Sequence, residues 1–256
     1  MTSPSKETRI SRWIICAMLG AAVTGCAATP TTPEGQLAAA EANDPMEPTN
    51  RAIFAFNKDV DDSVGKPVAR AYRDVVPEFA RDGIRNVLGN IEEPANFVNA
   101  VLQGEDERAA ETAVRFIFNS TAGIAGIFDV AADYGLEANE EDFGQTLAVW
   151  GVDEGPYVVL PLLGPSTARD AVGEIVDNFT NPIGYVMPGA ASITASVFEG
   201  IDLREQNLDT LDDLERNSID YYASMRSLYR QNRQAEIDNG ETTGPILEIP
   251  VYASTE

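Results

Sequence analysis

Apolar residues recur along most of the chain at the three- and four-residue spacing of an amphipathic helix. One run contains Ile84, Val87, Leu88 and Ile91, and later runs repeat its period. Such spacing places the apolar side chains on one face of a helix. Glycine and proline separate the runs, so the pattern predicts successive helices over 79–90, 94–103 and 105–119. Strict apolar–polar alternation is rare, and no Asn-Gly turn joins two alternating runs, so we expect an all-α fold.

A further helix is predicted ahead of these runs, near residue 45. Asp44 can cap its first turn, because a carboxylate accepts hydrogen bonds from the free amide groups there, and Pro45 suits the first helical position. The apolar residues of this helix are Ile53, Phe54, Phe56 and Val60.

Two sets of charges follow one another after residue 202. The first set is acidic, and the second is a stripe of arginines at helical spacing beside the apolar stripe of Tyr222, Met225 and Tyr229. We predict that the two sets pair within the chain; the alternative is a docking surface for another protein. The acidic set is Asp209, Asp212, Asp213 and Glu215, and the basic set is Arg226, Arg230 and Arg233.

Three stretches lack the usual polar face of an amphipathic helix. Residues 121–132 carry one charge, Asp129, and residues 155–166 and 178–198 carry none, although glycine or proline interrupts each stretch. Each of the three stretches has two alternative interpretations: a segment of the buried core, or a hairpin that dips into one membrane leaflet. The third is also long enough for a spanning helix, but its prolines, glycines and polar residues argue against that alternative.

The first 25 residues have the layout of a signal peptide, with basic residues followed by an apolar run too short to span a bilayer. Val23-Thr24-Gly25-Cys26 resembles a lipobox, so we expect cleavage before Cys26 and lipidation of its thiol; the alternative is an ordinary signal peptide. Ala27 and Ala28 then imply sorting to the outer membrane. We expect a flexible tether at 26–43, a helical body at 44–236 and an acidic, disordered tail at 237–256.

Composition excludes several kinds of chemistry. The chain has no histidine, and the only cysteine besides Cys26 is Cys16, which leaves with the signal peptide. Zinc sites, Cys-His pairs and Ser-His-Asp triads are therefore excluded, and neither a phosphate-binding loop nor a nucleophile elbow is present. The formal charge of −23 becomes −25 once the signal peptide, with three basic residues and one acidic residue, is removed. We expect no enzymatic activity, no cofactor, no metal and no nucleic-acid partner.

The order of short motifs between residues 44 and 233 resembles one family, the MlaA (VacJ) lipoproteins of the bacterial outer membrane. Each motif alone is weak, whereas so many in one order are specific. The motifs are Asp44–Arg51 (DPMEPTNR), Phe54–Asn57 (FAFN), Tyr72–Pro77 (YRDVVP), Glu92–Pro94, Leu102–Gly104, Arg115–Asn119 (RFIFN), Gly123–Ala131 (GIAGIFDVA), Glu141–Leu147 (EDFGQTL), Gly155–Pro161 (GPYVVLP), and Gly164–Ser166 with Arg169 and Asp170.

The resemblance implies a ring of amphipathic helices and helical hairpins, seated in one membrane leaflet around a central channel. It also implies a function: removal of mislocalised phospholipids from the outer leaflet and their transfer to the periplasmic carrier MlaC, beside a trimeric porin. The protein would be lipid-anchored on the periplasmic side of the outer membrane. A lipoprotein that scaffolds the envelope without moving lipid is the alternative, and a phospholipase is a third.

Particular residues take roles from the same resemblance. Phe56 and Asn57 lie in the motif that controls the channel in the family, although ordinary helix packing is the alternative there. The remaining candidates come from two of the uncharged stretches. Tyr157, Leu160 and Leu162 are candidates for channel-adjacent positions, and Ile124, Ile127, Phe128 and Val130 are candidates for insertion into the leaflet.

Overall fold

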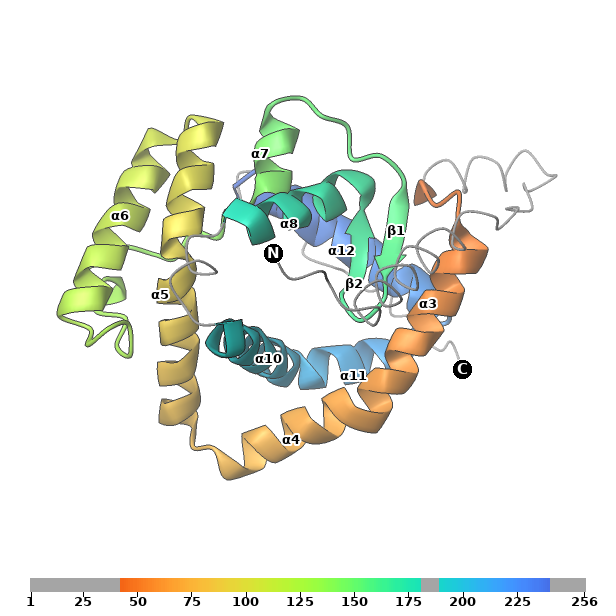
Figure 1. The fold of residues 1–256 in the computed structure, drawn as a ribbon. Coiled ribbons are helices and arrows are strands. Elements are labelled where there is room, and N and C mark those ends of the chain that lie inside the picture. Colours follow the sequence, from red (N-terminus) through yellow and green to blue (C-terminus); the bar gives the residue numbers. More distant parts are fainter. Residues whose placement is uncertain (1–41, 181–188, 240–256) are drawn as a thin grey trace, which may run out of the picture.

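Helices make up almost all regular structure in residues 42–180 and 189–239, the part of the chain that the computed structural model describes (Figure 1). This confirms the all-α prediction apart from one short β-hairpin. The helices are α3 (Glu47–Val60), the π-helix η2 (Asp61–Gly65), α4 (Lys66–Val75), α5 (Glu78–Gln103), α6 (Asp106–Thr121), the 3-10 helix η3 (Ala132–Tyr134), α7 (Phe143–Val149), α8 (Ala168–Thr180), α10 (Gly189–Gln206), α11 (Leu208–Asn217) and α12 (Tyr221–Ile237). The strands are β1 (Tyr157–Leu160) and β2 (Gly164–Thr167).

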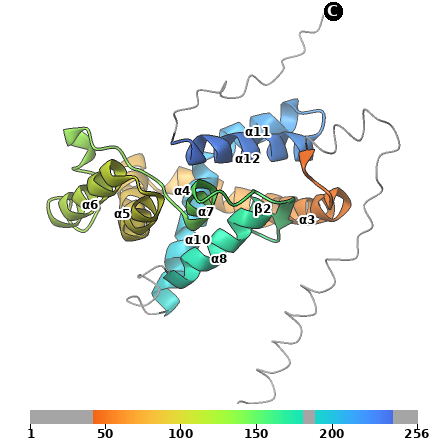
Figure 2. The ribbon, with the colours of Figure 1, turned by 90° about the horizontal axis from the view of Figure 1, so that it is seen from above.

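The helices form a broad, shallow arrangement. In Figure 1, α3 with α4 and then α5 form two sides of the molecule, and α10 and α11 run between them. The view from above in Figure 2 shows α11 and α12 on one side of the layer that holds α3 to α6, and α8 and α10 extending on the other. Within the described residues, no helix combines the length and the apolar character needed to cross a membrane. Much of the third uncharged stretch, at 181–188, lies outside those residues, as do 1–41 and 240–256.

The prediction of separate helices at 79–90 and 94–103 is wrong, because α5 is continuous from Glu78 to Gln103 with Pro94 inside it. Proline lacks an amide donor and so costs one helical hydrogen bond, but α5 packs extensively against α6, and this contact supports the continuous helix. The helix ends at Gly104, whose φ of 82° is left-handed. Glu105 N donates to Ala100 O and Gly104 N to Val101 O, the Schellman pattern that turns the chain into α6.

Residues 157–167 form an antiparallel hairpin, which the sequence pattern did not predict. Tyr157 pairs with Thr167 and Leu160 with Gly164, and a three-residue turn joins the strands. Leu162 in that turn has a φ of 68°, and Gly164 has a φ of 93°. One left-handed residue in the turn and a second at the first position of β2 replace the Asn-Gly signal that was absent from the sequence.

Helix α3 begins at Glu47, not at Pro45, and Asp44 does not cap it. The Asp44 carboxylate instead accepts hydrogen bonds from Asn50 Nδ2 at 2.7 Å, from Arg226 Nη1 at 2.8 Å and from the Tyr222 hydroxyl. The buried Asp44 therefore joins the start of the described chain to α12, near its other end.

The apolar core is small. It consists of Tyr157, Val159 and Tyr222, with partly buried residues from α3 and α12 packed around it. Among the described residues, buried polar and charged side chains outnumber buried apolar ones. Since large apolar side chains ordinarily fill protein interiors, most of those in this chain must lie elsewhere.

Candidate functional site

The loop between α6 and η3 presents apolar side chains on a tightly folded backbone. Ile124, Ala125 and Gly126 are consecutive left-handed residues, with φ of 55°, 57° and 89°. A Cβ on Gly126 would lie 2.6 Å from Asn90 Cβ, and one on Gly123 would lie 2.2 Å from Phe128 O. Both positions therefore require glycine, because the loop packs directly on α5 and on itself.

This loop pairs many of its polar backbone groups internally. Ala125 N donates to Ser120 O at 3.1 Å, Gly126 N to Asn119 O at 2.8 Å and Phe128 N to Gly123 O at 3.0 Å. The side chains of Ile124, Ile127 and Phe128 are meanwhile 61%, 43% and 57% exposed. Irregular backbone at membrane depth is tolerated only where it is buried in protein or lines a wet cavity, so the pairing of these amide groups within the loop and with the end of α6 lowers the cost of placing the loop near hydrocarbon.

A buried ion cluster anchors the loop from beneath. Arg115 of α6 donates from Nε to Glu93 Oε1 and from Nη2 to Asp129 Oδ2, both at 2.9 Å. Asn119 Nδ2 donates to the other oxygen of Asp129 at 2.9 Å. Burial acts to raise the pKa of Asp129, but the bonds from Arg115 and Asn119 together hold it below its ordinary value. Because Arg115 and Asn119 hold the Asp129 carboxylate, the one charge of residues 121–132 is paired within the protein. Val130, the next residue, is half-buried.

The hairpin tip is a second exposed apolar feature. Leu162 and Leu163 are 68% and 67% exposed, Leu160 is half-buried, and Tyr157 lies in the core. Asn57 of α3 holds this tip, since its Nδ2 donates to Leu160 O at 2.9 Å and its Oδ1 accepts from Leu162 N at 2.8 Å. Phe56, the neighbour of Asn57, is 51% exposed.

Asn50, two turns before Asn57 on the same face of α3, also hydrogen-bonds to the backbone of the hairpin, but at a buried position. Its Nδ2 donates to Tyr157 O and its Oδ1 accepts from Val159 N, both at 3.0 Å. The two asparagines therefore pair the free edge of β1 as a neighbouring strand would. Sequence reasoning singled out Asn57 but missed Asn50, although their seven-residue spacing was visible.

Large exposed apolar side chains extend far beyond the two loops. They cover faces of four helices, and a soluble monomer rarely exposes contiguous apolar patches larger than a few hundred Å². The described part of the molecule therefore has a polar interior and an apolar exterior, the reverse of a soluble protein, and we call this distribution its inverted polarity. The exposed residues include Phe97, Val98, Val101 and Leu102 on α5, Val114, Phe116, Ile117 and Phe118 on α6, Val172, Ile175 and Phe179 on α8, and Val197, Phe198 and Leu203 on α10.

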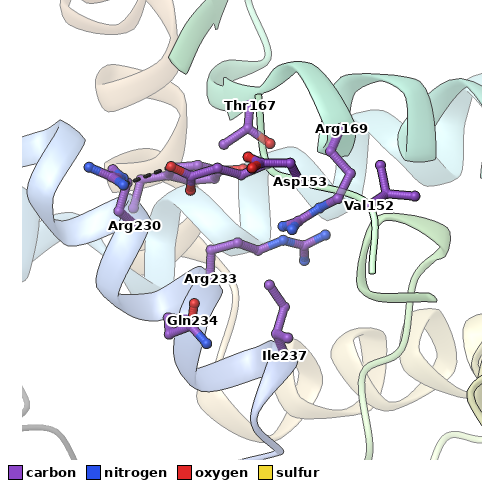
Figure 3. Close-up of a pocket in the computed structure, with 10 residues that line it drawn as sticks. Val152, Asp153, Thr167, Arg169, Arg230, Arg233, Gln234 and Ile237 are labelled. Carbon is purple, nitrogen blue, oxygen red and sulfur yellow. Dashed lines mark hydrogen bonds and ion pairs between the residues drawn. The ribbon is translucent and has the colours of Figure 1, made fainter. Parts of the chain in front are cut away.

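The arginine stripe of α12 forms ion pairs within the chain, but not with the acidic set that was predicted. Figure 3 shows two residues of this stripe, Arg230 and Arg233, at the cavity that they line. Arg226 pairs with Asp44, Arg230 with Glu154, and Arg233 with both Asp142 and Asp170. The predicted acidic partners contact other elements, because α11 lies against α4. Asp212 pairs with Lys66 and Arg70, and Glu215 with Lys58.

Arg233 is the centre of this polar interior. Its guanidinium contacts Asp142 Oδ2 at 2.6 Å and Asp170 Oδ1 at 2.9 Å, and its side chain is 11% exposed. Burial acts to raise the pKa of Asp170, but bonds from Arg233, Thr167 and Tyr229 together hold it below its ordinary value. One arginine therefore ties α12 to the segments that begin α7 and α8, beside a cavity of about 220 Å³.

Comparison with known proteins agrees with the motif order. A family model described as MlaA lipoprotein matches residues 42–236. This chain belongs to the MlaA lipoprotein family. The intermembrane phospholipid transport system lipoprotein MlaA of Escherichia coli (strain K12) is 39% identical over 86% of each chain. The Haemophilus influenzae lipoprotein of the same name is 33% identical over 94% of this chain and 96% of its own.

A solved structure of the family has the same architecture. It comes from work on the structural basis for maintenance of bacterial outer membrane lipid asymmetry, and its sequence is 41% identical. The two structures superimpose with a TM-score of 0.69, over 76% of this chain and 98% of the other.

Proposed function

We propose that this chain is an outer-membrane lipoprotein that removes mislocalised phospholipids from the outer leaflet and passes them to a periplasmic carrier. Its helices would form a ring seated in one leaflet around a central polar channel. The observation that carries the proposal is the inverted polarity, with apolar side chains such as Phe128 and Ile117 exposed while Arg115 and Glu93 are buried. A protein seated in hydrocarbon needs this distribution, whereas a soluble protein is penalised for it.

The chemistry of the cargo favours such a body. A phospholipid has a charged headgroup and two apolar tails, so its movement between leaflets needs a polar path for the head while the tails stay in lipid. No covalent bond is made or broken, and we therefore propose that the chain is not an enzyme. The Escherichia coli and Haemophilus influenzae relatives are named as phospholipid transport lipoproteins, and these names support the proposal that this chain transports phospholipid.

We extend the proposal to the anchor and the partners. Cys26 would carry the lipid that helps to hold the chain at the periplasmic side of the outer membrane. A single acyl chain alone binds a membrane only marginally, and the exposed apolar faces of the body would supply the second contribution that stable attachment needs. A trimeric porin would lie beside the body in the membrane. The carrier MlaC would take the lipid from the periplasmic side.

Complementation tests this function. Cells that lack the gene should accumulate phospholipid in the outer leaflet and become sensitive to detergent, and the wild-type chain should restore both properties. A Phe128→Asp variant should fail, because it places a carboxylate at the exposed loop, whereas Arg216→Asp on the exposed face of α11 should restore both. A normal outer leaflet in the deletion strain would favour a scaffold, and formation of lysophospholipid by the purified protein would favour an enzyme.

A further inference from the structure

A cavity of about 220 Å³ lies beside the C-terminal half of α12 (Figure 3). This volume is several times the share of about 30 Å³ that one water molecule occupies in the liquid. Its lining holds three arginines but only two carboxylates. The arginines are Arg169 of α8 with Arg230 and Arg233 of α12, and the carboxylates are Asp153 and Glu154. In a chain whose formal net charge is −23, this excess of cationic side chains sets the cavity apart.

Arg169 is a buried cation that shares its counterion. Its side chain is 6% exposed, and its one ion pair within the described residues is with Asp170. Asp170 Oδ1 accepts from Arg169 Nε at 3.0 Å and from Arg233 Nη2 at 2.9 Å. The other oxygen of Asp170 accepts from the hydroxyls of Thr167 and Tyr229. Arg233 has two further carboxylate partners, so the charge of Arg169 is the less completely compensated of the two. Because such a charge is costly to bury, an anion beside Arg169 would stabilise it.

One nitrogen of Arg169 is open to the cavity. Figure 3 shows the guanidinium groups of Arg169 and Arg233 next to each other at the cavity that both residues line. Nη1 of Arg169 has no acceptor within residues 42–180 and 189–239, yet it is not among the unpaired nitrogens that the protein shields from solvent, as Nε of Arg233 is. The N–H groups of this Nη1 can therefore donate to a ligand in the cavity.

The two carboxylates of the lining leave this donor free. Glu154 Oε1 already accepts from Arg230 Nη2 at 2.7 Å and from Asn43 Nδ2 at 2.9 Å. Asp153 is exposed, accepts a hydrogen bond from the backbone amide of Gly155 at 3.2 Å and forms no ion pair in the described parts of the chain. The effective dielectric constant is high around an exposed charge, so Asp153 opposes an incoming anion only weakly.

The chemistry of the open donor indicates the class of ligand. A guanidinium group favours phosphate and carboxylate, because its planar set of N–H donors matches the oxygens of these anions. The proposed cargo of this chain carries a phosphate in its headgroup. We propose that the cavity binds the phosphate of a phospholipid headgroup through Arg169. The inference rests on the proposed lipid transport and adds a binding site to it.

The test compares two lipids that differ in the phosphate. Full-length lipidated protein is equilibrated with neutral detergent micelles that contain equal amounts of phosphatidylglycerol and of diacylglycerol with the same acyl chains, and is then repurified. Mass spectrometry measures the ratio of the two lipids that each form of the protein retains, and circular dichroism checks the fold. The wild type should retain about tenfold more phosphatidylglycerol, the order that one hydrogen bond to a charged group supplies.

Two variants remove the site in different ways. Arg169→Gln removes the donor, and Arg216→Gln is its control, because it removes one positive charge at an exposed position outside the cavity. Val152→Trp fills the cavity at a residue that forms no ion pair. Val149→Trp is the matched control, since Val149 and Val152 are 45% and 44% exposed but only Val152 lines the cavity. The valine pair decides the test if Arg169→Gln fails to fold.

Both test variants should lose the preference for phosphatidylglycerol, and both controls should keep it. A preference that survives in Val152→Trp or in folded Arg169→Gln, or that is absent from the wild type, would overturn the inference and leave the proposed transport standing. Retention of neither lipid by any form would count against the transport itself. A final arm titrates inorganic phosphate without lipid: saturable binding that requires Arg169, together with no preference between the two lipids, would assign the cavity to free phosphate and overturn the lipid assignment.

Discussion

Replacing Arg233 with methionine should destabilise the protein strongly at neutral pH. The change keeps much of the side-chain volume but leaves Asp142 without its cation and Asp170 with Arg169 as its one remaining cation among the described residues. Removing one partner of a buried ion pair costs about 3–5 kcal/mol. Asp170 keeps its bonds from Thr167, Arg169 and Tyr229, and the side chain of Asp142 is 40% exposed, so we expect the low end of that range, about 3 kcal/mol.

The penalty should depend on pH with a defined sign. In the wild type the pKa of Asp170 is lower in the folded protein than in the unfolded chain. The ionised Asp170 therefore stabilises the fold at pH values above its unfolded pKa, and this stabilisation is lost as the pH falls through its folded pKa. Without the bond from Arg233, the pKa of the same carboxyl should be higher than in the wild type, because burial is then opposed by fewer lowering bonds, and protonation relieves the variant as the pH falls. The difference in stability should therefore be largest near pH 7 and should shrink toward about pH 4.

Urea unfolding in detergent, followed by circular dichroism at several pH values, measures this difference. Arg216→Met is the control, because the side chains of Arg216 and its partner Asp213 are 70% and 62% exposed. That pair should contribute less than about 0.5 kcal/mol. A loss for Arg233→Met as small as the control's, or one that does not change between pH 7 and pH 4, would show that Arg233 does not stabilise the buried carboxylates.

Other predictions follow from local contacts. Asn50→Ala should cost about 2–4 kcal/mol, because it leaves the buried Tyr157 carbonyl and Val159 amide unpaired, and hydrogen exchange at Val159 should accelerate; unchanged exchange would contradict this. Gly135→Ala should lower the free energy of unfolding by about 1–2 kcal/mol, because the φ of residue 135 is left-handed at 80°. Gly126→Ala should lower it further, because its Cβ would also lie 2.6 Å from Asn90 Cβ. Thermal unfolding measures both variants, and equal losses would argue against close packing at Gly126. Burial and Glu199 raise the pKa of Glu92 to about 8, whereas its pKa in the unfolded chain is about 4.3, so the free energy of unfolding of the wild type should decline as the pH rises between these two values. Glu92→Gln should lack this decline in the same urea experiment. Equal pH slopes for the two forms would exclude the raised pKa.

Periodicity predicted helical structure within α3, α5, α6 and α12, because local spacing decides which residues share a helix face, whereas it gave no range for α4, α7, α8, α10 or α11. It failed at Pro94, since a proline is read as a break, whereas contact with α6 keeps α5 continuous. It also failed at the hairpin, because the left-handed turn residue is Leu162, a residue type that carries no turn signal.

The polar interior could not be read from the sequence for a different reason. The α12 arginines were predicted to pair within the chain, but their partners depend on which elements pack against α12. Arg226 reaches Asp44, which is 182 residues away. Likewise, an amphipathic stripe such as that of α6 marks an apolar face without showing whether protein or lipid covers it. Only the three-dimensional arrangement places Ile117 outside and Arg115 inside.

The proposed function requires the apolar surface around residues 124–128 to be seated in a membrane leaflet. Spin labels on single cysteines at Phe128 and at Arg216, in the lipidated protein reconstituted into bilayers, test it through collisions with oxygen and with a water-soluble nickel complex. If the loop is seated in the leaflet, position 128 will show high oxygen and low nickel accessibility, and position 216 the reverse. Nickel accessibility at 128 equal to that at 216 would show that the loop lies in water and would contradict the proposed seating.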